Sequence, residues 1–101
     1  NDASLSEPAR DYLNDLATLL QSNDRLSLRV VGHTDNVGSA SANRKVSLAR
    51  ADAVVDYLSA IGINKKRMRA EGKGDTEPLV DNETEANRAI NRRVELIIYL
   101  E

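Results

Sequence analysis

The first hydrophobic pattern along the chain repeats every three or four residues, which is typical of one face of an amphipathic helix. The positions that follow it are Leu5, Ala9, Leu13, Leu16 and Leu20. Ser6 can act as the N-cap of such a helix, and Pro8 is tolerated in a first turn whose N–H groups have no helical partner. The pattern therefore predicts a helix over residues 5–21.

A second helical pattern covers residues 40–60, where apolar side chains again recur at intervals of three and four. The stripe that we expect to face the core consists of Val46, Ala49, Ala53, Tyr57 and Ile61, widened by Val54 and Leu58. Gly62 follows directly and favours a helix end there, because glycine readily adopts the left-handed conformation that closes many helices. A third and shorter helix is predicted over residues 84–90.

Alternating apolar and polar residues predict three strands. Residues 26–32 alternate clearly, and residues 68–72 form a shorter candidate. Residues 94–100 alternate as well, but both of their faces carry apolar side chains, which favours a strand that is central in the sheet or covered on both sides. The segments 34–38 and 73–82 contain the Gly, Asp and Asn residues that are typical of loops.

The resulting order of elements is helix, strand, helix, strand, helix, strand. It predicts an α/β (α+β) two-layer sandwich, in which the helices pack on a small mixed sheet of three or four strands. Helix-linked strands favour right-handed crossovers between parallel neighbours. Neither an internal repeat nor a linker interrupts the 101 residues. We therefore interpret residues 1–101 as a single domain.

Composition narrows the class of protein. Hydrophobic residues make up 41% of the chain and charged residues 30%, and the mean hydropathy is −0.47, which is typical of a folded, well-solvated domain. Aromatic residues make up only 3%, so the core must consist of Leu, Ile, Val and Ala. No apolar run approaches the roughly 20 residues that span a bilayer, and the first ten residues lack the order of a signal peptide. We expect no direct membrane insertion by this segment.

Cysteine and histidine are too scarce for most metal and thiol chemistry. The chain has no Cys and one His, which excludes disulfides, iron–sulfur clusters, thiol nucleophiles and Cys-based zinc sites. We predict no metal and no cofactor. The net charge of −2 argues against nucleic acid as the partner. The basic run of Lys65, Lys66, Arg67 and Arg69 is interpreted as a solvated loop.

One pair of charged residues is spaced as a ligand-binding pair would be. Asp35 follows the strand 26–32, and ligands of α/β proteins commonly bind at the carboxyl ends of strands. Arg50 lies on the helix that returns from this loop, about 20° around the helix axis from Asn43. A carboxylate facing a guanidinium suits a ligand that carries both an ammonium and a carboxylate group. The alternative is that Asp35 caps a turn and Arg50 extends into solvent.

The signals for catalysis are weaker. His33 lies beside Asp35, but no Gly-x-Ser-x-Gly motif accompanies them, and adjacent residues at a strand end rarely form a triad. Asp75 and Glu77 lie in a polar loop, and Gly72-Lys73-Gly74 lacks the spacing of a phosphate-binding loop. None of these patterns indicates a catalytic site, so we predict no enzyme.

These segments resemble a known family, the OmpA-like C-terminal domain. The resemblance covers nearly the whole chain and includes the run Gly32-His33-Thr34-Asp35-Asn36-Val37-Gly38-Ser39. The other matching positions are Asn43, Val46-Ser47, Arg50-Ala51, Val54, Tyr57-Leu58, Gly62-Ile63, Gly72-Lys73-Gly74, Pro78 and Asn91-Arg92-Arg93-Val94-Glu95.

The resemblance implies non-covalent binding of peptidoglycan in the periplasm of a Gram-negative bacterium, where family members tether the outer membrane or an envelope complex to the cell wall. The ligand would be the diaminopimelate residue of the stem peptide. Carried over by position, Asp35 would accept its ammonium group and Arg50 would hold its carboxylate. The residues expected to line the pocket and hydrogen-bond the peptide are Thr34, Asn43, Val46 and Arg93.

The chain also departs from the family's usual pattern. Family domains open with a further strand before the first helix, and this chain begins at about the position where that strand ends, so we expect a sheet without it. Asn1 is an additional candidate ligand contact from this entry loop. Two alternative functions stay open. One is a protein–protein module that forms a homodimer or docks an envelope or flagellar stator protein, and the other is a wall hydrolase that uses His33 and Ser47.

Overall fold

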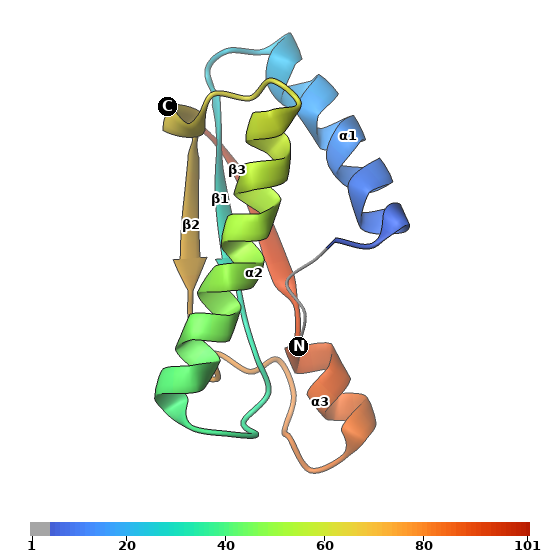
Figure 1. Ribbon diagram of the computed structural model, residues 1–101, viewed down its shortest axis with the longest axis vertical. Coiled ribbons are helices and arrows are strands. Elements are labelled where there is room, and N and C mark those ends of the chain that lie inside the picture. Colours follow the sequence, from blue (N-terminus) through green and yellow to red (C-terminus); the bar gives the residue numbers. More distant parts are fainter. Residues whose placement is uncertain (1–4) are drawn as a thin grey trace.

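The computed structural model describes residues 5–101 and contains the six expected elements, with a short additional 3-10 helix (Figure 1). The helices are α1 (Glu7–Ser22), α2 (Ala40–Ala60) and α3 (Glu85–Asn91), and the 3-10 turn η1 covers Lys65–Arg67. The strands are β1 (Leu26–Gly32), β2 (Met68–Gly72) and β3 (Val94–Leu100). Periodicity in the sequence therefore located every helix and strand to within two residues, which confirms the α/β interpretation.

The helix ends follow the local chemistry that the sequence indicated. The Ser6 hydroxyl accepts a hydrogen bond from the Ala9 N–H at 3.3 Å and caps α1, and Pro8 lies in its first turn. Gly62 follows Ile61, the C-cap of α2, with a φ of 113°, a conformation that costs glycine little. The capped ends fix where each helix meets the neighbouring loop.

The three strands form one mixed sheet in the order β2-β1-β3. Strand β1 is parallel to β2, with Leu28 opposite Met68, and antiparallel to β3, with Leu28 opposite Ile98. The parallel pair has the long helix α2 as its crossover, as expected. Helix α3 lies beyond the end of the sheet at which β2 finishes (Figure 1), so the chain re-enters the sheet from that same end and β3 runs antiparallel to β1.

The prediction that residues 94–100 form a central or covered strand is wrong. Strand β1 is central, and the outer edge of β3 has no partner strand within residues 5–101. Ile98 is 39% exposed and Leu100 is 64% exposed. Apolar residues on both faces were interpreted as double burial, but only the first half of β3, Val94 and Leu96, packs against the core.

The core lies between the sheet and the two long helices. In Figure 1, α2 crosses the front of the sheet and α1 lies beside it. The fully buried core side chains are aliphatic, as the scarcity of aromatic residues requires, and include Leu20, Leu28, Val30, Ala51, Leu58 and Ile63. Between α1 and the outer half of the sheet, an apolar hollow of about 250 Å³ opens beside Tyr12 and Leu96. None of the helices in residues 5–101 combines the length and apolar character needed to cross a membrane.

The predicted apolar stripe of α2 is correct only in part: Val54 and Leu58 are buried as expected, but the other five positions are half-buried or exposed, and small and polar residues form the first half of the buried face. That face consists of Asn43, Ser47, Ala51, Val54, Val55 and Leu58. Gly32 and Gly72 explain this arrangement: a Cβ atom at Gly32 would lie 2.0 Å from the Ser47 carbonyl oxygen, and one at Gly72 would lie 2.6 Å from the Leu48 nitrogen. The helix backbone thus contacts the strands directly, where bulky residues would not fit.

The basic run 65–67 is only partly a solvated segment. Lys65 and Lys66 are exposed as expected, but Arg67 is half-buried and its interpretation as a solvated residue is wrong. Its guanidinium donates hydrogen bonds to the carbonyl oxygens of Leu20, Asn23 and Leu26, at 2.7 to 3.1 Å. Arg67 therefore joins the end of α1 to the start of β1.

A buried asparagine fixes the loop between β2 and α3. The Asn91 side chain is completely buried and accepts hydrogen bonds from the N–H groups of Leu79 and Val80 at 2.9 and 3.2 Å. Its amide group donates to the Val80 carbonyl oxygen and to Asn82 Oδ1, both at 2.9 Å. Because Asn91 is the last residue of α3, these bonds set the position of that helix against the carboxyl end of β1.

Candidate ligand-binding site

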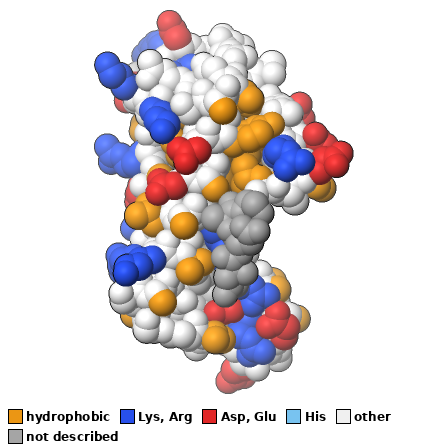
Figure 2. Space-filling view, viewed as in Figure 1, with side chains coloured by type: hydrophobic (Ala, Val, Ile, Leu, Met, Phe, Trp, Pro, Cys, Tyr) orange, Lys and Arg blue, Asp and Glu red, His pale blue; other side chains and the backbone are white. Residues whose placement is uncertain are grey.

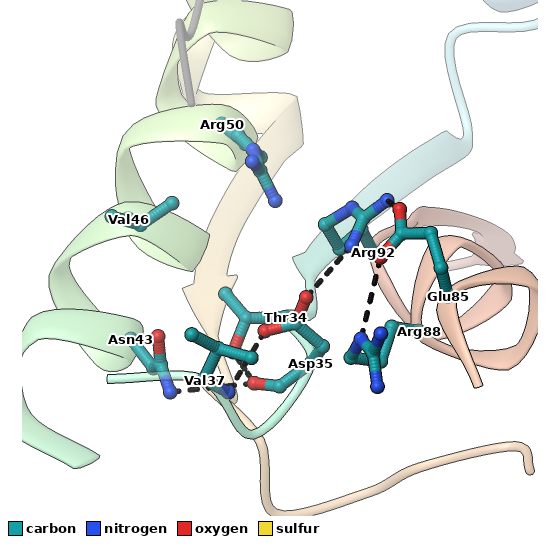
Figure 3. Close-up of a pocket in the computed structure, with 9 residues that line it drawn as sticks. All are labelled: Thr34, Asp35, Val37, Asn43, Val46, Arg50, Glu85, Arg88 and Arg92. Atoms are coloured by element: carbon teal, nitrogen blue, oxygen red, sulfur yellow. Dashed lines mark hydrogen bonds and ion pairs between the residues drawn. The ribbon is translucent and has the colours of Figure 1, made fainter. Parts of the chain in front are cut away.

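A polar cavity of about 390 Å³ opens at the carboxyl end of β1 (Figure 3). Three segments that are distant in sequence form it: the loop after β1, the first half of α2, and α3. The lining residues are Thr34, Asp35, Val37, Asn43, Val46, Arg50, Glu85, Arg88 and Arg92. Thus five of the seven residues proposed from the sequence, Thr34, Asp35, Asn43, Val46 and Arg50, line one cavity.

Asp35 presents a carboxylate that the fold holds in place. Its side chain is only 12% exposed, and its Oδ1 atom accepts a hydrogen bond from the Val37 N–H at 3.0 Å. Its Oδ2 atom accepts one from Arg92 Nη1 at 2.8 Å. Burial raises the pKa of Asp35, but the hydrogen bonds from Arg92 and Val37 outweigh this effect and leave the pKa below its usual value. Asp35 is therefore ionised at neutral pH.

Two neighbouring side chains hold the loop that carries Asp35. The hydroxyl of Thr34 donates to the Asp35 carbonyl oxygen at 2.8 Å, and Asn43 Nδ2 donates to the same oxygen at 3.3 Å. Both side chains are buried. Because Asn43 lies on α2, its hydrogen bond fixes the loop that carries the Asp35 carboxylate relative to that helix.

Arg50 faces the same cavity from α2, one turn beyond Val46 (Figure 3). It is half-buried, and within residues 5–101 its guanidinium forms neither a hydrogen bond nor an ion pair. Asp35 pairs with Arg92 and not with Arg50. The two charged groups therefore share a cavity without neutralising each other, which leaves the guanidinium available to an anionic group.

The sequence did not identify the residues that α3 contributes. Arg92 bridges two carboxylates, because its Nη2 atom donates to Glu85 Oε2 at 2.7 Å while Nη1 contacts Asp35. Glu85 also accepts from Arg88 Nε at 3.3 Å, and these hydrogen bonds, chiefly that from Arg92, lower its pKa. Figure 2 shows acidic and basic side chains intermixed over the region of α3. The 85–88–92 spacing of three and four was the available signal for a shared helix face.

Arg93, proposed from the sequence as a pocket residue, does not line the cavity. Its Nη2 atom donates to the Glu77 carbonyl oxygen at 3.0 Å and lies 3.4 Å from Glu95 Oε2. Adjacent residues in extended chain point to opposite sides, so Arg92 and Arg93 cannot both face the same cavity. The remaining candidate, Asn1, lies outside the described residues.

The residues considered for a hydrolase are not arranged for catalysis. His33 is 1% exposed, and its Nε2 atom lies 2.8 Å from Glu95 Oε1, a hydrogen bond that lowers the pKa of Glu95. The Ser47 hydroxyl donates to the Arg44 carbonyl oxygen and accepts from the Gly74 N–H, both at 2.9 Å. Neither side chain lines the cavity. In the part of the chain that the structure describes, no three His, Asp or Glu side chains are grouped so that they could hold a metal ion.

The lowered pKa of Asp35 predicts how the stability of this region depends on pH. A carboxyl group whose pKa is lower in the folded state stabilises the fold above its unfolded-state pKa of about 4, and this contribution disappears as the pH falls through the folded-state value. Asp35→Asn should therefore lower the free energy of unfolding by about 1–2 kcal/mol at pH 7. Denaturation of both proteins at pH 7 and at pH 3 should show a smaller difference at pH 3, because Asp35 of the unfolded chain is by then mostly protonated. A difference that is the same at both pH values would contradict the assigned ion pair.

The chain is similar in sequence to several known proteins. A model of the OmpA family matches residues 1–92. The chain is 41% identical over 83 residues to outer membrane porin F of Pseudomonas fluorescens, covering 82% of this chain and 26% of the porin. It is 38% identical over 100 residues to the peptidoglycan-binding protein ArfA of Mycobacterium tuberculosis, covering 97% of this chain and 30% of ArfA.

The fold has a close counterpart among solved structures. The crystal structure of the peptidoglycan-associated lipoprotein from Burkholderia pseudomallei superposes with a TM-score of 0.94 and 28% identity, over 98% of this chain and 84% of that chain. The two curated relatives above are much longer than this chain. It spans 26% and 30% of their lengths, so it corresponds to only one part of each of them.

Proposed function

This chain belongs to the OmpA family, and on that premise we propose that it binds peptidoglycan non-covalently through the diaminopimelate residue of the stem peptide. The proteins to which it is similar include a peptidoglycan-binding protein and a peptidoglycan-associated lipoprotein. The domain would thereby tether the outer membrane or an envelope complex to the cell wall from the periplasmic side.

The observation that carries this proposal is the guanidinium of Arg50, which has no ion pair within residues 5–101, in the same cavity as the fixed carboxylate of Asp35. The side chain of diaminopimelate ends in a carbon atom that bears an ammonium and a carboxylate group. Asp35 still has unused lone pairs on both oxygens and can accept the ammonium, while the planar fork of Arg50 can donate two parallel hydrogen bonds to the carboxylate. Val46 lies beside them and can contact the methylene chain of the ligand.

The site is suited to binding and not to bond cleavage. Its lining residues include no serine, cysteine or histidine that a neighbouring base could activate. Charge-assisted hydrogen bonds in a partly desolvated site contribute about 1.5–3 kcal/mol each, so two such groups correspond to dissociation constants from millimolar to tens of micromolar. Stable retention on the wall would come from the repetition of the ligand along the polymer and from other wall-binding modules tethered nearby.

Sedimentation with insoluble peptidoglycan tests the proposal. Arg50→Ala should abolish co-sedimentation with diaminopimelate-containing sacculi and leave the thermal midpoint within about 2 °C of wild type, because Arg50 makes no ion pair in residues 5–101. Asp35→Asn should abolish it as well, with the loss of stability given above.

Arg44→Ala is the matched control, since Arg44 is exposed on the same helix and does not line the cavity. Its co-sedimentation should equal that of wild type. Wild-type levels of wall binding by both Arg50→Ala and Asp35→Asn would refute the site.

A further inference from the structure

The cavity is lined by more positive than negative side chains, and they are not all paired with one another. Three guanidinium groups, those of Arg50, Arg88 and Arg92, face two carboxylates, those of Asp35 and Glu85. Both carboxylates are already paired: Asp35 with Arg92, and Glu85 with Arg92 and Arg88. The excess positive charge is therefore located at Arg50.

This imbalance disfavours a ligand group that brings only positive charge. An ammonium group approaching Asp35 meets a carboxylate whose charge Arg92 already offsets at 2.8 Å. The cation of Arg50, which has no ion pair among the described residues, shares the same cavity. The Asp35 and Arg92 side chains are 12% and 30% exposed, so these charges are screened less than fully solvated ones. An ammonium group is well accommodated only if the ligand also carries an anion for Arg50.

We propose that the cavity recognises the ionisation of the ligand's side-chain carboxyl group, so that it binds diaminopimelate with a free carboxylate and discriminates against the amidated form. This inference rests on the proposed function and adds the chemical form of the ligand to it. Arg50 is the residue that makes the distinction. Asp35 accepts the ammonium group, but its own charge is already offset by Arg92 and does not balance that of the ligand.

Amidation changes two properties of the ligand at Arg50. It removes the negative charge, so that the bound ligand end becomes a net cation in a cavity that already has excess positive charge. It also replaces one acceptor oxygen by an NH2 donor, and guanidinium groups have donors only. The parallel pair of hydrogen bonds is then lost, and a donor faces a donor. At this subsite, amidated diaminopimelate resembles lysine, which lacks the carboxylate altogether.

Calorimetric titration with three synthetic stem tripeptides tests the inference. Their third residue is meso-diaminopimelate, the same residue amidated on its side-chain carboxyl, or L-lysine. For the 101-residue chain we expect the free-acid peptide to bind at least about tenfold more tightly than the other two, which should be similar to each other. In Arg50→Gln the affinity for the free-acid peptide should fall to that for the amidated one, so the discrimination disappears. Arg44→Gln, outside the cavity, should keep the full discrimination.

The possible outcomes separate this inference from the proposed function. If none of the three peptides binds wild type, the proposed function itself fails. If the free-acid and amidated peptides bind equally and both exceed the lysine peptide, diaminopimelate binding stands and recognition of the carboxylate charge is refuted. If the discrimination survives in Arg50→Gln, its assignment to Arg50 is wrong.

Discussion

Gly32→Ala should lower the free energy of unfolding by about 3 kcal/mol, at the upper end of the cost of overpacking a core. The added Cβ would lie 2.0 Å from the Ser47 carbonyl oxygen and 2.8 Å from its carbonyl carbon. Both are backbone atoms in the middle of α2, so no side-chain rotation relieves the overlap. The helix must move away from the sheet, and chemical denaturation should show the loss, with a thermal midpoint lower by more than about 10 °C.

A second glycine provides the control for this prediction. Gly38 has a φ of 93°, and a Cβ there would approach nothing closer than Asn43 Oδ1 at 3.7 Å. Gly38→Ala should therefore cost only the strain of the left-handed backbone, about 1–2 kcal/mol. Equal losses for the two variants would show that the close contact of α2 with β1 is not what Gly32 provides. Because Asn43 and Arg50 both lie on α2, Gly32→Ala should also displace the guanidinium side of the cavity.

Arg67→Met should cost about 3 kcal/mol, although position 67 lies in a basic run that resembles an ordinary solvated loop. Methionine keeps an unbranched apolar stem but removes the donors that contact three backbone carbonyl groups, those of Leu20, Asn23 and Leu26. Hydrogen bonds from a charged donor contribute about 1.5–3 kcal/mol each, and partial solvation of the released carbonyl groups reduces the sum.

The neighbouring residue Lys66 is the matched control for Arg67. It is exposed on the same 3-10 turn, so Lys66→Met should change the free energy of unfolding by less than about 0.5 kcal/mol. Urea denaturation of both variants measures the two effects. A loss below about 1 kcal/mol for Arg67→Met would contradict its role in joining α1 to β1.

The sequence predicts those parts of the fold that depend on neighbours along the chain. The 3–4 spacing of leucines in α1 and the Ser6 cap are local features, and both are confirmed. Val54 and Leu58 were correctly assigned to the buried face of α2, but Asn43, Ser47 and Ala51 were missed. That first half of the face depends on Gly32 and Gly72, which are distant in sequence and admit the helix backbone. The edge position of β3 is likewise set by pairing and not by its own alternation, which shows apolar residues on both faces.

The candidate site, like the fold, could be predicted from the sequence only in part. Asp35 and Arg50 could be placed together because a strand end and the helix that returns from it are adjacent in sequence and in space. Arg92 and Glu85 could not, because the position of α3 depends on the hydrogen bonds of Asn91 to the loop of residues 79–82. The position of α3 also determines that Arg92, and not Arg93, faces the cavity.

The proposed site can be well defined even though its binding energy is expected to be modest. Thr34 and Asn43 fix the backbone of Asp35, and Arg92 and the Val37 N–H fix its carboxylate, before any ligand arrives. Little ordering of the protein is then needed on binding, so the modest energy of the charged contacts is retained as affinity. The free side chain of Arg50 is the part of the site that would still have to be ordered by the ligand.

The most direct test of the account is an NMR titration of the isotope-labelled chain with the meso-diaminopimelate tripeptide, followed at the Arg50 Nε–H and the Asp35 side-chain carboxyl carbon. We predict that both resonances shift with a single saturation curve, while those of Arg44 remain unchanged. The lysine tripeptide should leave the Arg50 resonance in place. Saturable binding that shifts neither Arg50 nor Asp35, or equal Arg50 shifts with both peptides, would contradict the proposed ligand site.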